Sequence, residues 1–248
     1  MELRPQRAVI IGASSGIGRA LAKELAKAGY WVGLTGRRVE LLESLRAELP
    51  SKGFVKKIDL RMPEEAILEV KQLIQEMGGL DLMIVNAGID LPNPNLDWKS
   101  YHEIFKVNIL GFMAMCHVAI DQFKIQQHGH LVGISSIAGI RGNGRAPAYA
   151  ASKAFVSNYL EGIRQRIGTP QIHVTDIRPG FVNTEMIKEK RITFWMVSAA
   201  IAARQIFQAI QKKRRVAYVT KRWQLAACIL RILPGWLYDR LAQRVIRD

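Results

Sequence analysis

The heptapeptide Gly12-Ala13-Ser14-Ser15-Gly16-Ile17-Gly18 lies between a short apolar run, residues 8–11, and a segment whose apolar residues have helical spacing. In such a turn Gly12 permits the sharp bend, Gly16 lets the backbone approach a phosphate, and Gly18 lets the helix pack closely on the sheet. The free N–H groups at the start of the helix then face an anion. This strand–turn–helix order predicts a nucleotide site rather than a plain structural turn.

Strand and helix patterns alternate on both sides of this turn. Strands are expected at 8–11, 30–35, 54–59, 80–86, 130–135, 172–178 and 215–220. Helices are expected at 17–28, 39–49, 63–77, 98–123, 147–168 and 197–212. The alternation predicts a single-domain α/β fold of the Rossmann type, a doubly wound parallel sheet of about seven strands with helices on both faces. The ligand site should lie at the carboxyl ends of the strands.

Length and composition fit one domain. The chain has 248 residues, 49% hydrophobic and 23% charged, enough for one buried core but not two. We expect a dinucleotide-binding and catalytic unit over residues 1–220 and a basic, apolar helical tail of the same domain over residues 221–248. Two cysteines, Cys116 and Cys228, are too few for a disulfide framework and favour a reducing, cytoplasmic location. No signal peptide and no stretch of roughly 20 apolar residues is recognised.

The glycine spacing and several further motifs resemble the short-chain dehydrogenase/reductase family. The motifs are Asn86-Ala87-Gly88 after the fourth strand, Asn108 in a helix, Ser136 thirteen residues before a Tyr149-x-x-x-Lys153 pair, and Pro179-Gly180 with Thr184 after the sixth strand. They occur in the family's order from Val9 to Thr220. The resemblance implies an oxidoreductase that interconverts a carbonyl and an alcohol by hydride transfer with a nicotinamide cofactor.

The resemblance also implies roles for single residues. Tyr149 is the proton donor or acceptor, Ser136 hydrogen-bonds the substrate carbonyl, and Lys153 binds the nicotinamide ribose. Asn108 holds a water that links Lys153 to solvent, and Thr184 bonds the nicotinamide carboxamide. The expected cofactor-binding set is Gly12, Ser14, Ser15, Gly16, Ile17, Gly18, Arg37, Arg38, Asp59, Leu60, Asn86, Ala87, Gly88, Tyr149, Lys153, Pro179, Gly180, Val182 and Thr184.

The end of the second strand bears on the choice of nicotinamide cofactor. NAD enzymes usually place an acid there to bind the ribose 2′-OH, but this chain has Gly36-Arg37-Arg38 and no acid before Glu40. A guanidinium can grip a 2′-phosphate with two hydrogen bonds, so we expect NADP(H), with Arg37 as the leading residue. The alternative is a pair of solvated arginines, although arginine at a helix start opposes the helix dipole. The resemblance places Asp59 near adenine; otherwise it is a cap or turn acid.

Tyr149 and Lys153 are spaced i, i+4, which places them on one helix face. A tyrosine of pKa about 10 is an inefficient acid or base near neutral pH. An ammonium about 4 Å away, at an effective dielectric of about 20, favours the phenolate by on the order of 4 kcal/mol before desolvation is subtracted. We therefore predict a lowered pKa for Tyr149. No HExxH, CxxC or paired-carboxylate motif is found, so no metal is predicted.

The net charge of +15 favours an anionic partner. Between Lys212 and Asp248, ten Lys and Arg stand against two Asp, which gives this segment +8. The segment mixes its charges with Trp223, Trp236 and aliphatic residues, a pattern typical of helices at a membrane interface. The alternative is a helix packed on the sheet or on another subunit. No nucleic-acid-binding module accompanies the charge, so nucleic acid is not predicted as a partner.

Three functional hypotheses follow from these observations. The first is an NADP(H)-dependent carbonyl reductase or alcohol dehydrogenase for a bulky, lipid-like substrate, reached at the inner face of a membrane. It is favoured because only about a dozen residues separate Thr184 from the next helix and leave the site open. The second is a soluble reductase of small carbonyls, and the third a catalytically idle NADP-binding sensor. A homodimer or homotetramer is expected.

Overall fold

The computed structural model describes residues 4–186 and 194–247. Seven parallel strands form one sheet in the order β3-β2-β1-β4-β5-β6-β9. Their bounds are β1 Arg7–Ile11, β2 Trp31–Gly36, β3 Gly53–Lys57, β4 Leu82–Val85, β5 Gly129–Ile134, β6 Ile172–Pro179 and β9 Val216–Val219. Two short strands, β7 (Val182–Asn183) and β8 (Val197–Ser198), pair with each other. The strand order reverses between β1 and β4, which confirms the predicted doubly wound Rossmann-type sheet.

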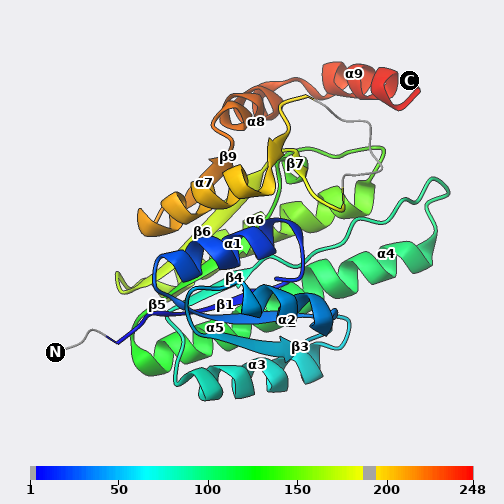
Figure 1. Ribbon diagram of the computed structural model, residues 1–248. Helices are drawn as coiled ribbons and strands as arrows, with labels where there is room; N and C mark the ends of the chain where they lie inside the picture. Colours follow the sequence, from blue (N-terminus) through cyan, green and yellow to red (C-terminus); the bar gives the residue numbers. More distant parts are fainter. Residues whose placement is uncertain (1–3, 187–193, 248) are drawn as a thin grey trace.

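Helices cover both faces of this sheet (Figure 1). One face carries α1 (Gly16–Lys27), α2 (Val39–Ala47) and α7 (Ala199–Gln211). The other carries α3 (Pro63–Met77), α5 (Phe112–Gln126) and α6 (Pro147–Ile167). Successive side chains of a strand point to opposite faces, so Val9 of β1 packs in one apolar layer and Ile10 in the other. Burial on both faces explains why the strands read as continuous apolar runs.

The long helical stretch predicted from Trp98 is divided into three parts. It begins as α4 (Trp98–Phe105), passes through a π-helical segment, η1 (Lys106–Gly111), and continues as α5. A π-helix holds more residues per turn than an α-helix and often marks a functional position. The apolar pattern runs unbroken through η1, so sequence periodicity predicted one uniform helix.

The same stretch corrects the sequence prediction that no segment is long and apolar enough to span a membrane. Over Trp98–Gln126 the chain is long and apolar enough, by length and composition alone, to cross a membrane. Half of its most apolar window is nevertheless buried inside the domain. Phe112 and Phe123, which it contributes, are among the largest fully buried side chains. Its apolar character is therefore accounted for by the core of the domain.

Two helices follow the last strand of the sheet: α8 (Arg222–Ile232) and α9 (Gly235–Arg247), at the top of Figure 1. The inward face of α8 buries Trp223 and Ala227 against Ile137 and Phe181. A Cβ on Gly180 would lie 2.0 Å from Trp223 Nε1, so a side chain there would displace the indole. The inner face of α8 thus packs on the domain, as the packing interpretation of the tail expected.

Candidate active site

A pocket of about 550 Å³ opens where β1, β2, β4, β5 and β6 end. Of the sequence-predicted residues it is lined by Gly12, Ser14, Ser15, Gly16, Ile17, Arg37, Arg38, Asp59, Leu60, Asn86, Ala87, Gly88, Ser136, Tyr149, Lys153, Pro179, Gly180, Val182 and Thr184. Two predicted residues, Gly18 and Asn108, are not on its wall. Both lie behind the wall and hold it in place.

The glycine turn packs its backbone tightly on neighbouring segments. A Cβ on Gly12, whose φ is +89°, would lie 2.9 Å from the backbone of Ala87. A Cβ on Gly18 would lie 2.0 Å from the carbonyl oxygen of Gly12. That oxygen accepts a hydrogen bond of 2.7 Å from Asn86 Nδ2. Gly18 therefore allows the helix–turn contact expected of it, while Gly12 and Gly16 line the pocket.

The first turn of α1 has the features of an anion cradle. Its N-cap, Ser15, makes no side-chain hydrogen bond to the helix, and no acidic residue lies in the first turn. N–H groups at such a helix end carry partial positive charge and bind phosphate. A Cβ on Gly16 would lie 3.0 Å from Cγ2 of Thr184, which also lines the pocket. Its absence leaves space, and the turn fits the pyrophosphate of a dinucleotide.

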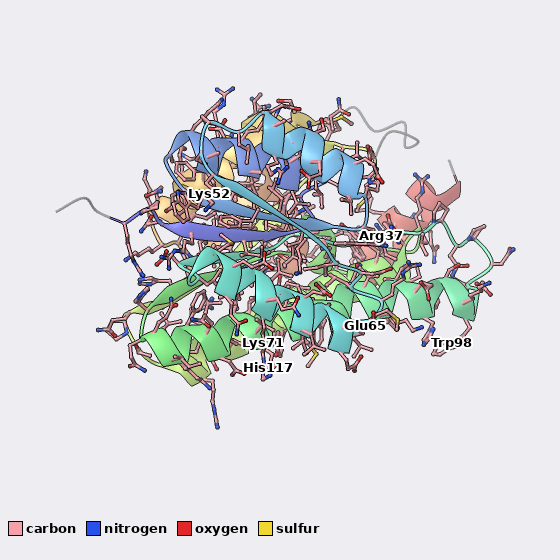
Figure 2. All side chains as sticks on the ribbon, turned by 60° about the horizontal axis from the view of Figure 1, so that its bottom comes forward. Arg37, Lys52, Glu65, Lys71, Trp98 and His117 are labelled. Atoms are coloured by element: carbon pink, nitrogen blue, oxygen red, sulfur yellow. The ribbon has the colours of Figure 1, made fainter. Side chains whose placement is uncertain are left out.

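The two arginines after β2 take different positions. Arg38 Nη2 donates to Ser14 Oγ at 3.1 Å and to Ser15 Oγ at 2.8 Å, while its Nη1 donates to Glu185 Oε2 at 3.0 Å. Arg38 therefore lies across the glycine turn. Arg37 is exposed on the pocket wall, toward the same end of the molecule as Trp98 (Figure 2).

Asp59 is held by a neighbour that sequence reasoning missed. Arg61 Nε lies 3.0 and 2.9 Å from its two carboxylate oxygens. Hydrogen bonding from Arg61 is the main cause that holds the pKa of Asp59 below its ordinary value, and the charge of Arg37 adds a smaller contribution. The Asp-x-Arg spacing was a local signal that could have revealed this pair. The predicted adenine contact would have to share this carboxylate with Arg61.

Three of the four predicted catalytic side chains, Ser136, Tyr149 and Lys153, lie together at the end of β5. The Tyr149 hydroxyl is hydrogen-bonded to the Ser136 side chain. Lys153 Nζ donates to the carbonyl oxygen of Ile134 at 2.9 Å and lies 5.8 Å from the centroid of the Tyr149 ring. Both Tyr149 and Lys153 project from α6, which starts with Pro147 in its first turn, a favoured position for proline.

The predicted lowering of the Tyr149 pKa is wrong for the protein alone. Burial raises the pKa of Tyr149 to about 12, against an opposing effect of the hydrogen bond to Ser136. Burial likewise lowers the pKa of Lys153 to about 8, while the charge of Asp176 raises it. Desolvation penalises the charged form of each group. For Tyr149 burial is the largest cause, and the charge of Asp90 raises the pKa further, so the phenol is neutral at pH 7.

Asn108 fixes the segment after β4 from within η1. Its Oδ1 accepts from the backbone N–H of Ile89 at 2.8 Å, and its Nδ2 donates to the Ile89 carbonyl at 2.9 Å and to Ser152 Oγ at 3.0 Å. A Cβ on Gly88 would lie 3.1 Å from Lys153 Nζ. Asn108 thus joins the pocket wall to α6 beside the lysine.

A buried ion pair lies behind the catalytic cluster. Arg178 Nε donates to Asp176 Oδ2 at 2.6 Å, and Arg178 Nη1 donates to the Tyr218 hydroxyl at 3.1 Å. The Ser135 hydroxyl also bonds to Asp176. Ser135 is therefore engaged in this pair, whereas its neighbour Ser136 bonds to Tyr149. Within residues 4–186 and 194–247, no three His, Cys, Asp or Glu side chains are grouped to hold a metal.

Comparisons with known proteins agree with this geometry. The family described as short chain dehydrogenase matches residues 6–194. An oxidoreductase of Myxococcus xanthus (strain DK1622) is 34% identical over 252 residues, which cover 98% of this chain and 99% of its own. Dehydrogenase/reductase SDR family member 7B of Mus musculus is 30% identical over 268 residues, which cover 99% of this chain and 83% of its own.

Solved structures show the same fold. An alcohol dehydrogenase from the archaeon Thermococcus sibiricus, complexed with 5-hydroxy-NADP, has a TM-score of 0.75 at 25% identity and covers 87% of this chain and 95% of its own. A short chain dehydrogenase/reductase from Burkholderia phymatum, in complex with NAD, has a TM-score of 0.81 at 20% identity and covers 92% and 94%. These neighbours hold NAD in one case and an NADP derivative in the other.

Proposed function

The chain belongs to the short-chain dehydrogenase family, and from its pocket we propose that it is an NADP(H)-dependent oxidoreductase that interconverts a carbonyl and an alcohol. The family makes it an oxidoreductase with a nicotinamide cofactor and a small-molecule substrate. The observation that carries the finer proposal is the Ser136–Tyr149–Lys153 cluster, which shares one pocket with the glycine turn and two arginines.

Each residue of the cluster has its own role in the proposed reaction. A nicotinamide dinucleotide bound on the glycine turn supplies or accepts the hydride. Tyr149, neutral at pH 7, donates its hydroxyl proton to the substrate oxygen as a carbonyl is reduced. Ser136, which bonds to the same hydroxyl, also orients that oxygen. Lys153, fixed by the Ile134 carbonyl, contributes positive charge beside the phenolate that the proton transfer leaves behind.

The rim of the pocket favours a bulky apolar substrate over a small carbonyl. Leu91 and Met186 both line the pocket and both expose more than a third of their surface. Apolar groups at an open mouth offer little to a small polar carbonyl but can bind an alkyl or acyl chain.

The arginines after β2 predict the cofactor preference. NADP(H) should bind at least tenfold more tightly than NAD(H), a difference of about 1.4 kcal/mol. The reason is that a 2′-phosphate would meet the guanidinium groups of Arg37 and Arg38, and the segment after β2 has no acid before Glu40. Arg37→Ala and Arg38→Ala should each reduce that ratio. The measurement is a fluorescence titration with NADPH and with NADH.

Arg46→Ala is the matched control, since Arg46 is an exposed arginine of α2 that pairs with Glu43 outside the pocket. It should leave the ratio unchanged. Equal affinity of the unmodified protein for the two cofactors would overturn the proposed NADP(H) preference, while leaving the oxidoreductase assignment in place.

The raised pKa of Tyr149 predicts different pH profiles for the two directions. A raised pKa keeps the proton on the phenol, so the donor required for reduction is present from about pH 6 to pH 9. Oxidation of an alcohol needs the phenolate, whose fraction grows about tenfold per pH unit below the pKa. Initial rates should show a flat profile for reduction and a steep rise for oxidation; a flat oxidation profile would contradict this assignment.

A further inference from the structure

The outer face of α8 is an apolar ridge with no partner in the described structure. Leu225, Ile229 and Ile232 are 64%, 50% and 81% exposed. They are spaced i, i+4, i+7, so they form one stripe opposite the buried Trp223 and Ala227. Arg222 and Arg231 are exposed on the two sides of this ridge. An apolar stripe flanked by arginines suits an interface that is apolar below and charged above.

A cationic groove of about 1000 Å³ lies beside this ridge, along the edge strand β9. Its charged lining residues are Arg164, Arg178, Lys212, Arg214, Lys221, Arg222, Arg231 and the single acid Glu161. Arg178 is neutralised by Asp176, which leaves a clear excess of positive charge at the surface. The groove shares Arg222 and Arg231 with the ridge, so apolar and cationic surfaces meet along one helix.

The last helix continues this arrangement. Trp236, at the start of α9, is 69% exposed. The Tyr238 hydroxyl bonds to the carbonyl of Gly142, and the Arg141 guanidinium lies 4.6 Å above the Tyr238 ring. Arg141 Nη1 also donates to the carbonyl of Leu233 at 3.0 Å, between α8 and α9. The two helices are thereby fixed to the loop that joins Ser136 to Tyr149.

We propose that α8 and α9 dock on the surface of an anionic phospholipid membrane, with the ridge inserted among the lipids and the cationic groove against their head groups. Charge complementarity selects this occupant over a second copy of the chain, because two copies would oppose their positive grooves. Through Arg141 and Tyr238, docking holds the loop between Ser136 and Tyr149 near the lipid. Docking does not depend on the reaction proposed above.

Co-sedimentation of the full chain with vesicles tests this proposal. Vesicles of equal parts phosphatidylcholine and phosphatidylglycerol should bind the protein at low salt, and pure phosphatidylcholine should bind it much more weakly. Added salt should weaken binding because it screens charge. Apolar contacts of the ridge should keep part of the binding at high salt. Ile229→Asp should weaken partition at least tenfold, and Arg222→Glu about fivefold.

Matched controls are available on other helices. Ile125→Asp makes the same change at a residue of α5 that is 79% exposed. Lys71→Glu reverses a charge on α3, which covers the other face of the sheet from α7 (Figures 1 and 2). Both controls should bind vesicles like the unmodified protein. Arg222→Glu should not unfold α8, since an acid in the first turn favours the helix dipole.

NADPH binding and the thermal unfolding midpoint should stay unchanged in all four variants, which separates this proposal from the proposed reaction. Failure of the full chain to bind the anionic vesicles at low salt would overturn the docking proposal. So would unchanged binding of Ile229→Asp. If light scattering showed that Ile229→Asp halves the mass in solution without affecting vesicle binding, the ridge would be an interface between two copies instead.

Discussion

Tyr149→Phe should lower turnover by about 10²-fold or more while NADPH binding stays nearly intact. The substitution removes only the hydroxyl that bonds to Ser136, so the ring, its packing on α6 and the ribose contact expected of Lys153 are retained. The measurement is kcat with a panel of ketones that includes long alkyl chains, together with a fluorescence titration of NADPH.

Tyr159→Phe is the matched control for this prediction. Tyr159 lies on the same helix, packs on Phe155 and Phe112, and is absent from the pocket wall. It should keep nearly full turnover. If Tyr149→Phe retained near-normal turnover of a true substrate, Tyr149 would not be the proton donor, and the mechanism would be wrong even if the cofactor preference held.

Asp176→Ala should lower the free energy of unfolding by about 3–5 kcal/mol, because it leaves the buried Arg178 guanidinium without its counter-charge. Asp176 is 1% exposed and binds both Arg178 Nε and the Ser135 hydroxyl. Loss of its charge should also lower the pKa of Lys153 further. Urea unfolding of the two proteins measures the change in stability.

Two further variants distinguish the loss of the buried ion pair from the loss of any carboxylate. Asp121→Ala removes an exposed acid that pairs with His117 and should cost less than about 1 kcal/mol. The double variant Asp176→Ala/Arg178→Met should recover much of the lost stability, since replacing both partners removes the uncompensated charge. A single variant as stable as the unmodified protein would show that Arg178 is satisfied by Tyr218 and solvent.

Local sequence patterns were sufficient for the fold. The apolar runs of the strands, the glycine turn and the helical spacing each depend on neighbouring residues, and together they predicted the sheet. The π-helical segment was not predicted, because its distinguishing hydrogen bonds leave no trace in the spacing of apolar residues. Asn108 within it binds the backbone of Ile89, 19 positions earlier in the chain, and the spacing of apolar residues does not predict this contact.

The candidate site was predicted less evenly. The motifs placed Ser136, Tyr149 and Lys153 in one pocket, but the direction of the Tyr149 pKa was wrong because the sequence does not reveal how strongly the hydroxyl is desolvated. The ion pair between Arg38 and Glu185 joins residues 147 positions apart, and no local pattern predicts it. In the tail, alternating charge and apolar residues could not show that Trp223 is buried while Trp236 is exposed.

The packing of Trp223 on Gly180 also sets the order in which the site can mature during protein synthesis. The ribosome makes Ser136, Tyr149 and Lys153 before the tryptophan that supports the opposite wall. At about 5–20 residues per second, roughly 2–9 s separate the synthesis of Gly180 from that of Trp223. A nascent chain therefore carries its reactive side chains before Trp223 can pack behind Gly180. A truncated mRNA that ends after codon 220 would encode a site without this support.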